Sequence, residues 1–160
     1  MALINNCQYM TAASSHPTNA ALRAYLLPRL RAGLPELMAP GDVARPYDTL
    51  GTHPDLVARL WDELGRGLPE DCRRIFCGTP VLMHPASGIV FAFAQGTHTY
   101  ALRVPEPERT AALAAGATRV VKYPGNQGSL DLDTFGPEWV FGRWLKGEPK
   151  WCASAHAFAA

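Results

Sequence analysis

The side chains with the greatest chemical potential in this chain are its histidines and cysteines, and their spacing matches no established site. They are His16, His53, His84, His98, His156, Cys7, Cys72, Cys77 and Cys152. Neither HExxH nor HxH occurs, and no cysteine spacing matches a paired zinc site. We therefore expect no metal site, and we expect free cysteines that are mostly buried, as this residue type tends to be.

Motifs for nucleophilic catalysis and nucleotide binding are also absent. The sequence contains no G-x-S-x-G elbow, no G-x-x-x-x-G-K-[ST] loop and no G-x-G-x-x-G fingerprint. Cys77 follows Ile75 and Phe76, which indicates a core strand rather than the exposed, electropositive setting that activates a thiol. Asp131 and Asp133 suit a solvated strand edge better than an acid–base pair. These patterns favour a protein with no catalytic residues and no cofactor.

One polar group on a predicted hairpin is a candidate ligand site. His98 lies at the mouth of this hairpin, on the same predicted face as Tyr100. A histidine there would act as a general base or, as we favour, as a hydrogen-bonded rim residue. Together with Arg103 and Trp139, these side chains define a candidate pocket between the strands and a long loop of residues 34–51.

Cations and tryptophans gather in the C-terminal half of the chain. They are Arg103, Arg119, Lys122, Arg143, Lys146, Lys150, Trp139, Trp144 and Trp151. Such residues stack on bases and contact phosphates, which would make a nucleic-acid surface. The interpretation that we favour is that the tryptophans are core residues, covered by the aliphatic stems of the cations.

The overall composition indicates an ordinary globular protein. The chain has 160 residues, of which 48% are hydrophobic and 18% charged, and its net charge is +1. These values predict one domain over residues 1–160 with no global attraction for nucleic acid. Residues 1–15 carry weak signals and are expected to form a loosely docked arm. Because no signal peptide or membrane span is recognisable, we expect a cytoplasmic, bacterial protein without membrane contact.

Helical periodicity marks two segments of the N-terminal half. A first helix is expected from Thr18, and Pro28 should kink it or end its first part. The second helix has the clearest start, because Thr52 and Asp55 have the spacing of a capping box. Trp61 belongs to the apolar stripe of this second helix, so we expect it in the core.

The middle of the chain reads as strands. Residues 89–94 are apolar and uncharged, which predicts a central strand with Ile89, Phe91 and Phe93 on one face and small residues on the other. Further strands are expected over residues 74–77, 81–83, 97–104, 118–123, 130–133 and 139–141, and a short helix over 106–115.

A helix beginning at Pro149 should close the chain, with Trp151, Ala155 and Phe158 sharing a face. The order of elements predicts an α+β fold with N-terminal helices, an antiparallel β-meander and a C-terminal helix.

Three short stretches carry a family resemblance. RRIFCG, GIVFAF and YALRVPEPER follow one another within residues 73–116, and this order is similar to the N-terminal domain of TfoX-like proteins. The matching positions are Arg74, Phe76, Gly78, Gly88, Phe91, Ala92, Leu102 and Arg103. Cys77 replaces the first glycine of the family pattern, and the first 50 residues have no counterpart. The resemblance implies a small α+β domain, often a dimer, of regulatory or unknown role and without established catalytic residues; a YjbR-like fold is the alternative.

Three functional interpretations follow, in order of preference. The first is a non-enzymatic cytoplasmic regulatory domain that binds a protein partner or a second copy of itself. The second is a small-molecule-binding protein or minor enzyme with a pocket at His98, Tyr100, Arg103 and Trp139. The third is nucleic-acid binding through the basic and aromatic residues of the C-terminal region.

Overall fold

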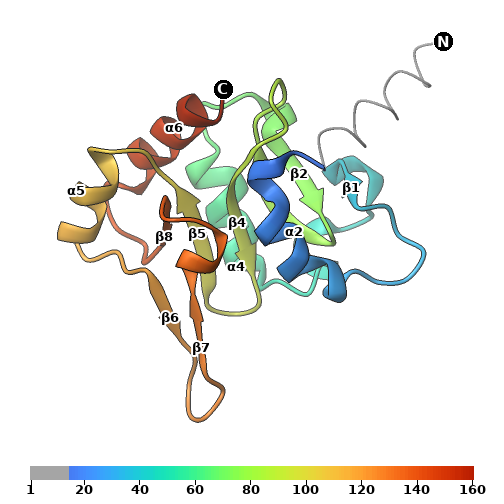
Figure 1. Cartoon of the computed structure of the whole chain (residues 1–160). Helices are drawn as coiled ribbons and strands as arrows, with labels where there is room; N and C mark the ends of the chain where they lie inside the picture. Colours follow the sequence, from blue (N-terminus) through green and yellow to red (C-terminus); the bar gives the residue numbers. More distant parts are fainter. Residues whose placement is uncertain (1–14) are drawn as a thin grey trace.

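A six-stranded antiparallel sheet forms the centre of the protein (Figure 1). The structure is a computed structural model that describes residues 15–160, so the predicted arm lies outside it except for Ser15. The strands are β1 (Leu37–Met38), β2 (Arg73–Phe76), β3 (Thr79–Met83), β4 (Val90–Gln95), β5 (Thr99–Arg103) and β8 (Trp139–Phe141). They are ordered β1-β2-β3-β4-β5-β8. The predicted α+β class, with N-terminal helices, an antiparallel meander and a C-terminal helix, is confirmed.

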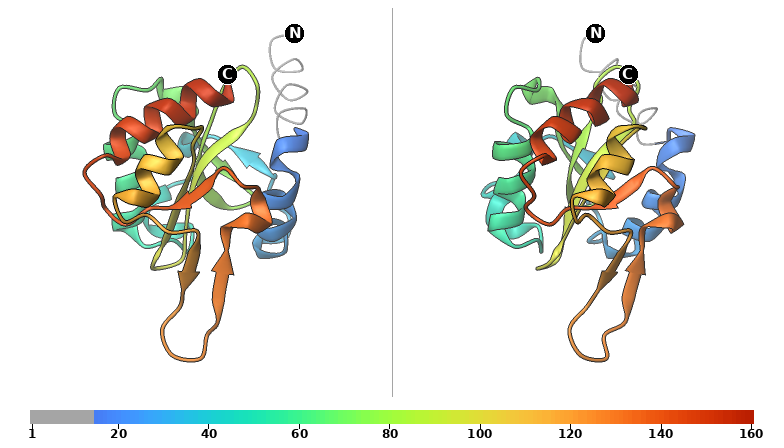
Figure 2. Two further views of the ribbon diagram at one scale, coloured as in Figure 1. Left: turned by 60° about the vertical axis from the view of Figure 1, so that its left-hand side comes forward. Right: turned by 90° about the vertical axis from the view of Figure 1, so that its left-hand side faces the viewer.

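Helices cover both faces of the sheet (Figure 2). The first face carries α4 (Pro54–Ala58), its continuation η4 (Arg59–Leu64), α5 (Glu108–Ala114) and α6 (Glu148–Ala159). The second face carries α2 (Ala20–Leu26) and η6 (Leu132–Phe135). Each face has its own apolar cluster, with Leu102 in the first and the adjacent Ala101 in the second. This division follows from the alternation of side chains along a strand.

The remaining elements are short. They are η1 (Pro17–Asn19), η2 (Leu27–Arg29), η3 (Pro40–Asp42), α3 (Pro46–Thr49), η5 (Glu70–Cys72), β6 (Val120–Lys122) and β7 (Ser129–Asp131). Strands β6 and β7 pair only with each other, and their hairpin projects from the body of the protein (Figures 1 and 2). The strand expected at 130–133 ends at Asp131. The Asp131 carboxylate accepts a hydrogen bond from the Asp133 N–H at 3.0 Å, and this contact starts η6.

The first two helices begin and end for local reasons. Helix α2 ends at Leu26, and Pro28 lies in the 3-10 turn that follows, so the proline ends the first part of the predicted helix. The predicted capping box at Thr52 is wrong. The cap of α4 is His53, whose Nδ1 accepts from the Asp55 N–H at 3.1 Å, while Thr52 Oγ1 donates to the Ala94 carbonyl.

Trp61 lies in the core, as predicted. Its side chain is 1% exposed, and its indole N–H donates to the Val81 carbonyl at 2.9 Å, which ties η4 to β3. The helix ends at Gly65, whose N–H bonds to the Leu60 carbonyl in the wider spacing of a π-helix.

Strand β4 is central, but the predicted separation of large and small residues is wrong. Phe93 belongs to the second cluster, whereas Phe91 belongs to the first together with Ala92. The cause is a β-bulge. Val90 pairs with Met83 and Ala92 pairs with Leu82, so Phe91 is an extra residue that breaks the alternation.

The closing helix α6 runs over Glu148–Ala159 and buries a face that differs from the predicted one. Trp151 and Ala155 are buried as expected, but Phe158 is 39% exposed and stacks under the Arg103 guanidinium at 4.4 Å. Cys152 and Ala159 take the inward positions instead. Phe158 has the helical spacing from Ala155 that the prediction used, but the buried stripe includes the next residue, Ala159, in its place.

Candidate functional site

Within residues 15–160 the cysteines are buried, and the metal-binding residue types do not cluster. No group of three or more His, Cys, Asp or Glu side chains in this range is arranged to hold a metal ion. Cys72, Cys77 and Cys152 are free and buried, as predicted, and Cys7 lies outside the described residues. Burial raises the pKa of Cys72 and Cys77 to about 11 and that of Cys152 to about 12. All three are therefore protonated at neutral pH, which is the unreactive form.

The four side chains of the predicted ligand pocket lie in different surroundings. His98 is exposed in the turn before β5. Tyr100 is buried on the first face of the sheet, and Trp139 is buried on the second. Arg103 is engaged with Phe158, and desolvation lowers its pKa.

His98 lines a cavity that the other three residues do not line. That cavity holds about 460 Å³ and is mainly polar. Tyr25 and Gln95 share it, and the Tyr25 hydroxyl donates to Gln95 Oε1 at 3.0 Å. Arg29 covers the Tyr25 ring at 4.2 Å. His98 therefore lines this cavity without Tyr100, Arg103 or Trp139, and its role as a rim residue stays a prediction.

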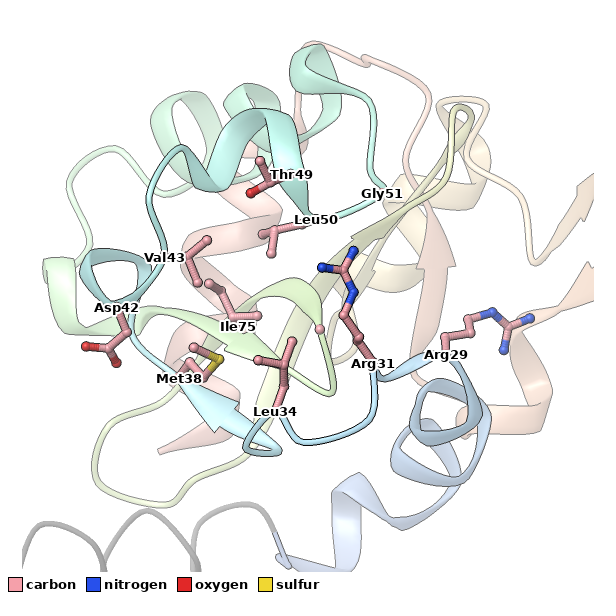
Figure 3. A pocket seen from close by; sticks show the side chains of 11 residues that line it. Arg29, Arg31, Leu34, Met38, Asp42, Val43, Thr49, Leu50, Gly51 and Ile75 are labelled. Carbon is pink, nitrogen blue, oxygen red and sulfur yellow. The ribbon is translucent and has the colours of Figure 1, made fainter.

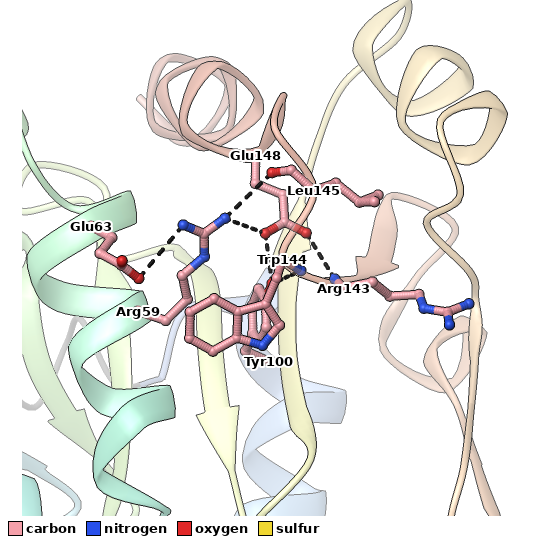
Figure 4. A network of polar contacts seen from close by, with 7 residues as sticks. All are labelled: Arg59, Glu63, Tyr100, Arg143, Trp144, Leu145 and Glu148. Atoms are coloured by element: carbon pink, nitrogen blue, oxygen red, sulfur yellow. Dashed lines mark hydrogen bonds and ion pairs between the residues drawn. The ribbon is translucent and has the colours of Figure 1, made fainter.

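The densest polar arrangement in the described chain surrounds Glu148, at the start of α6 (Figure 4). Glu148 is 0% exposed. Its carboxylate accepts from the Tyr100 hydroxyl at 2.6 Å, from Arg59 Nη2 at 2.7 Å and from the Arg143 N–H at 2.8 Å. A buried carboxylate is tolerated when a cation and several donors satisfy it in this way.

Arg59 and Tyr100 complete this network, which we call the Glu148 network: Arg59, Tyr100 and Glu148. Burial alone would lower the pKa of Arg59, but its hydrogen bonds to Glu148 and Tyr100 outweigh burial and raise it. Burial raises the pKa of Tyr100, and the neighbouring Glu148 adds to the effect. At neutral pH the network therefore holds the Arg59 cation and a neutral Tyr100 phenol.

The Glu148 network holds the segment Gly142–Gly147 against the sheet. The Trp144 N–H donates to the Tyr100 hydroxyl, and Arg59 Nη2 also reaches the Leu145 carbonyl at 3.4 Å. The two glycines are required by close packing. A Cβ on Gly142 would overlap the Tyr100 ring, and one on Gly147 would lie 2.6 Å from the Trp151 ring.

Trp144 is the residue that this segment presents to solvent. Its backbone is left-handed, with φ of 59°, and its side chain is 51% exposed. The indole stacks on the Arg59 guanidinium at 5.0 Å and meets the Tyr100 ring edge-on at 5.7 Å. Trp144 is thus an exposed aromatic side chain with a fixed position (Figure 4).

Three exposed cations lie within six residues of Trp144 along the chain. Arg143, Lys146 and Lys150 are exposed, and their side chains make no ion pair within residues 15–160. We call Arg143, Trp144, Lys146 and Lys150 the Trp144 surface. The predicted grouping of cations and tryptophans is reduced to this surface, because Trp139 and Trp151 are core residues.

Sequence reasoning missed Arg59 and Glu148. Glu148 precedes Pro149 in the first turn of a helix, where an acidic residue has an ordinary explanation in the helix dipole. Arg59 lies 89 residues away along the chain. No local pattern links the two residues, so only the folded chain reveals their pairing.

Comparison of the chain with protein-family models, with curated proteins and with solved structures found no match. The resemblance of residues 73–116 to TfoX-like proteins therefore stays a prediction. Within residues 15–160, no helix is both long enough and apolar enough to cross a membrane.

Proposed function

We propose that the protein is a non-enzymatic binding module that docks the Trp144 surface against an acidic protein partner. The observation that carries this proposal is Trp144 itself: half-exposed, left-handed in its backbone, and held by a buried network. Tryptophan is enriched among the few residues that dominate binding energy at protein interfaces.

Rigidity is what makes Trp144 suited to binding. A non-glycine residue in the left-handed region costs about 1–2 kcal/mol, so the surrounding contacts must hold it there. The stacked guanidinium of Arg59 and the hydrogen bond to Tyr100 provide those contacts. A side chain that is already fixed loses little entropy on binding, and more of its contact energy appears as affinity.

The charges around Trp144 define the chemistry of the partner. Arg143, Lys146 and Lys150 are exposed and form no ion pair with residues 15–160, which favours a partner surface rich in Asp and Glu. Complementary charge of this kind raises the association rate and rejects basic partners. The partner that we propose is another protein with an acidic rim around an apolar depression for the indole.

A protein partner is better supported than nucleic acid. Binding of single strands relies on several aromatic side chains that stack successive bases. Trp139 and Trp151 are buried, so only one of the three C-terminal tryptophans remains for stacking, and the net charge is only +1. The TfoX-like resemblance supports a regulatory role in the bacterial cytoplasm and makes a second copy of the chain the competing partner.

The test is quantitative affinity capture from cells that naturally express the protein, with wild type, Trp144→Ala and Phe158→Ala compared. Phe158 is a matched control, because it is also an exposed aromatic residue that contacts an arginine. A partner captured by wild type and Phe158→Ala, but not by Trp144→Ala, is then purified and titrated by calorimetry. We expect at least a tenfold loss of affinity for Trp144→Ala and weaker binding as salt rises.

Three results would contradict the proposal. The first is a captured set that does not change in Trp144→Ala. The second is capture that nuclease treatment abolishes, which would indicate nucleic acid. The third is an effect of Trp144→Ala on self-association alone in analytical ultracentrifugation, which would indicate a second copy.

A further inference from the structure

A second feature lies at the other edge of the sheet and shares no residue with the Trp144 surface. A cavity of about 460 Å³ opens between the segment of residues 34–51 and the β2–β3 hairpin (Figure 3). Its apolar lining comes from Leu34, Met38, Val43, Leu50 and Ile75. This volume lies within the range of small-molecule sites, and a largely apolar lining is typical of them.

The segment of residues 34–51, which includes β1 of the sheet, is attached to the rest of the protein on two sides of the cavity. At its start, the Cys77 N–H donates to the Glu36 carbonyl at 2.6 Å, and Arg23 pairs with the Glu36 carboxylate. At its far side, the Tyr47 hydroxyl donates to Asp62 at 2.9 Å, and the ring packs edge-on against Trp61. These two attachments fix the walls and leave the interior unfilled.

The floor of the cavity is part of the sheet. Ile75 on β2 is 1% exposed, and it pairs across the strands with Met38 on β1. Both side chains appear in Figure 3 beneath Leu50 and Val43. An apolar ligand entering here would therefore rest on side chains of the sheet.

One unpaired cation lies at the mouth. Arg31 is exposed, its side chain makes no hydrogen bond or ion pair within residues 15–160, and its guanidinium lies over the opening (Figure 3). Arg29 points away and is already engaged, because its Nη1 donates to the Tyr25 carbonyl at 2.5 Å. The acidic residue of the rim, Asp42, also points outward, and its carboxylate accepts from the Ala39 N–H at 3.0 Å. The charge available to a ligand is thus positive.

We propose that this cavity binds a small amphipathic anion, with its apolar body on Met38, Val43, Leu50 and Ile75 and its acidic group against Arg31. Carboxylates, sulfonates and phosphates all match a guanidinium, which can donate two parallel hydrogen bonds to them. A neutral molecule of the same shape would gain the apolar contacts but not the charged one. The anion therefore binds more tightly than its neutral counterpart.

The test uses two pairs of probes; the members of each pair share an apolar body, and one member carries an anionic group that the other lacks. 8-Anilinonaphthalene-1-sulfonate is compared with N-phenyl-1-naphthylamine by fluorescence, and decanoate is compared with decanol by competition. The proteins are wild type, Arg31→Gln and Arg66→Gln; Arg66 is an exposed arginine that does not line the cavity, so it controls for net charge. We expect Arg31→Gln to weaken anion binding about tenfold and to change neutral binding less than about twofold, and Arg66→Gln to match wild type.

The position of the bound probe is read independently from methionine methyl groups labelled with carbon-13. Met38 lines the cavity, whereas Met83 is buried in the second cluster, so Met83 is an internal reference in the same sample. Decanoate should shift the Met38 signal and leave Met83 in place. This measurement needs no variant and does not depend on whether a substitution folds.

Two outcomes would overturn this inference. Equal losses in Arg31→Gln and Arg66→Gln would mean that the anion responds to net charge and not to this cavity. A decanoate titration that leaves the Met38 signal unmoved would mean that the probes bind elsewhere. Neither outcome bears on Trp144, so the two proposals stand or fall separately.

Discussion

The two edges of the central sheet lead into irregular segments that are built in opposite ways. After β8, the segment Gly142–Gly147 lies over a buried ion pair and presents a projecting tryptophan. The segment of residues 34–51 contains β1, is attached at its ends, and leaves an apolar hollow. The contrast shows that a buried ion pair and an apolar cavity lead to different kinds of surface. A satisfied buried charge permits one arrangement of the groups around it, whereas an apolar wall with no filler leaves a cavity.

The largest effect should come from the Glu148 network. Replacing Glu148 with alanine leaves the Arg59 guanidinium buried without its main partner. We expect the free energy of unfolding to fall by about 3–5 kcal/mol, the usual cost of breaking one side of a buried pair. The matched control is Glu63→Ala, because Glu63 contacts the same arginine at 3.5 Å but is half exposed, and its loss should cost less than about 1 kcal/mol. Urea denaturation checks both values, and equal losses would show that the network is not the anchor.

The buried thiols of the two regions should make the protein less stable at alkaline pH. Burial raises the pKa of Cys77 to about 11 and that of Cys152 to about 12, from an ordinary value of 9.0. A raised pKa means that the folded state holds its proton more tightly. The stabilisation is therefore complete below pH 9 and is lost as the pH rises through the folded-state values.

Urea denaturation at pH 8, 9, 10 and 11 tests this pH dependence. For Cys77 the loss should be about 2 kcal/mol between pH 9 and 11, on the scale of a shift of two pKa units. The free energy of unfolding should fall less steeply with pH in Cys77→Ala and Cys152→Ala than in wild type. For Cys152→Ala the difference from wild type should still be growing at pH 11, because the folded-state pKa of Cys152 is about 12. Parallel profiles for all three proteins would contradict the prediction, whatever the cost of each substitution at pH 8.

Two glycines give a direct comparison of the two segments. Gly142→Ala places a methyl group against the Tyr100 ring, so we expect a loss of about 1–3 kcal/mol from overpacking. Gly41→Ala adds the same group where no atom lies within 4 Å, and its backbone is not left-handed. The second change should be neutral or should stabilise by about 0.4–1 kcal/mol through the unfolded chain. Thermal denaturation of both variants measures the two effects. A larger loss of stability in Gly41→Ala than in Gly142→Ala would contradict the prediction.

The smallest effect concerns the backbone of Trp144. Because its φ is 59°, Trp144→Gly should be more stable than Trp144→Ala by about 1 kcal/mol, the cost of the left-handed conformation for a side chain. Both variants should lose partner binding to the same degree, since both lack the indole. If alanine proved as stable as glycine, the backbone at this position would not be held in the left-handed region. The difference in stability is measured from the denaturant midpoints of the two variants, provided that their unfolding curves have the same m-value.

Local patterns predicted much of the fold, and their failures have physical causes. Trp61 was placed in the core by the helical stripe to which it belongs, and the structure confirms it. Phe93 was misplaced because alternation assumes an unbroken ladder, and one extra residue at Phe91 shifts every position behind it. Phe158 was misplaced because the helical period fixes which residues share a stripe but not how far that stripe turns toward the core.

The candidate sites were harder to predict than the fold. The sequence marked the cations and tryptophans of the C-terminal region but could not separate exposed Trp144 from buried Trp139 and Trp151. It also grouped His98, Tyr100, Arg103 and Trp139, which the fold distributes over a turn, two opposite faces of the sheet and a stacking contact on α6. Proximity along a hairpin predicts which side chains are neighbours, but not what covers them.

Composition and periodicity by themselves determined the α+β class, the strands of the central meander and the closing helix, and the burial of the described cysteines; they did not predict β1 or α3 within residues 34–51. These properties depend on short-range rules: alternation, helical spacing, turn residues and the low polarity of a thiol. Only the tertiary structure decided that Arg59 meets Glu148, that Trp144 is held outside, and that the segment of residues 34–51 arches over a hollow. The physical reason is that a buried ion pair, a strained backbone and an empty volume are each set by chain segments far apart in the sequence.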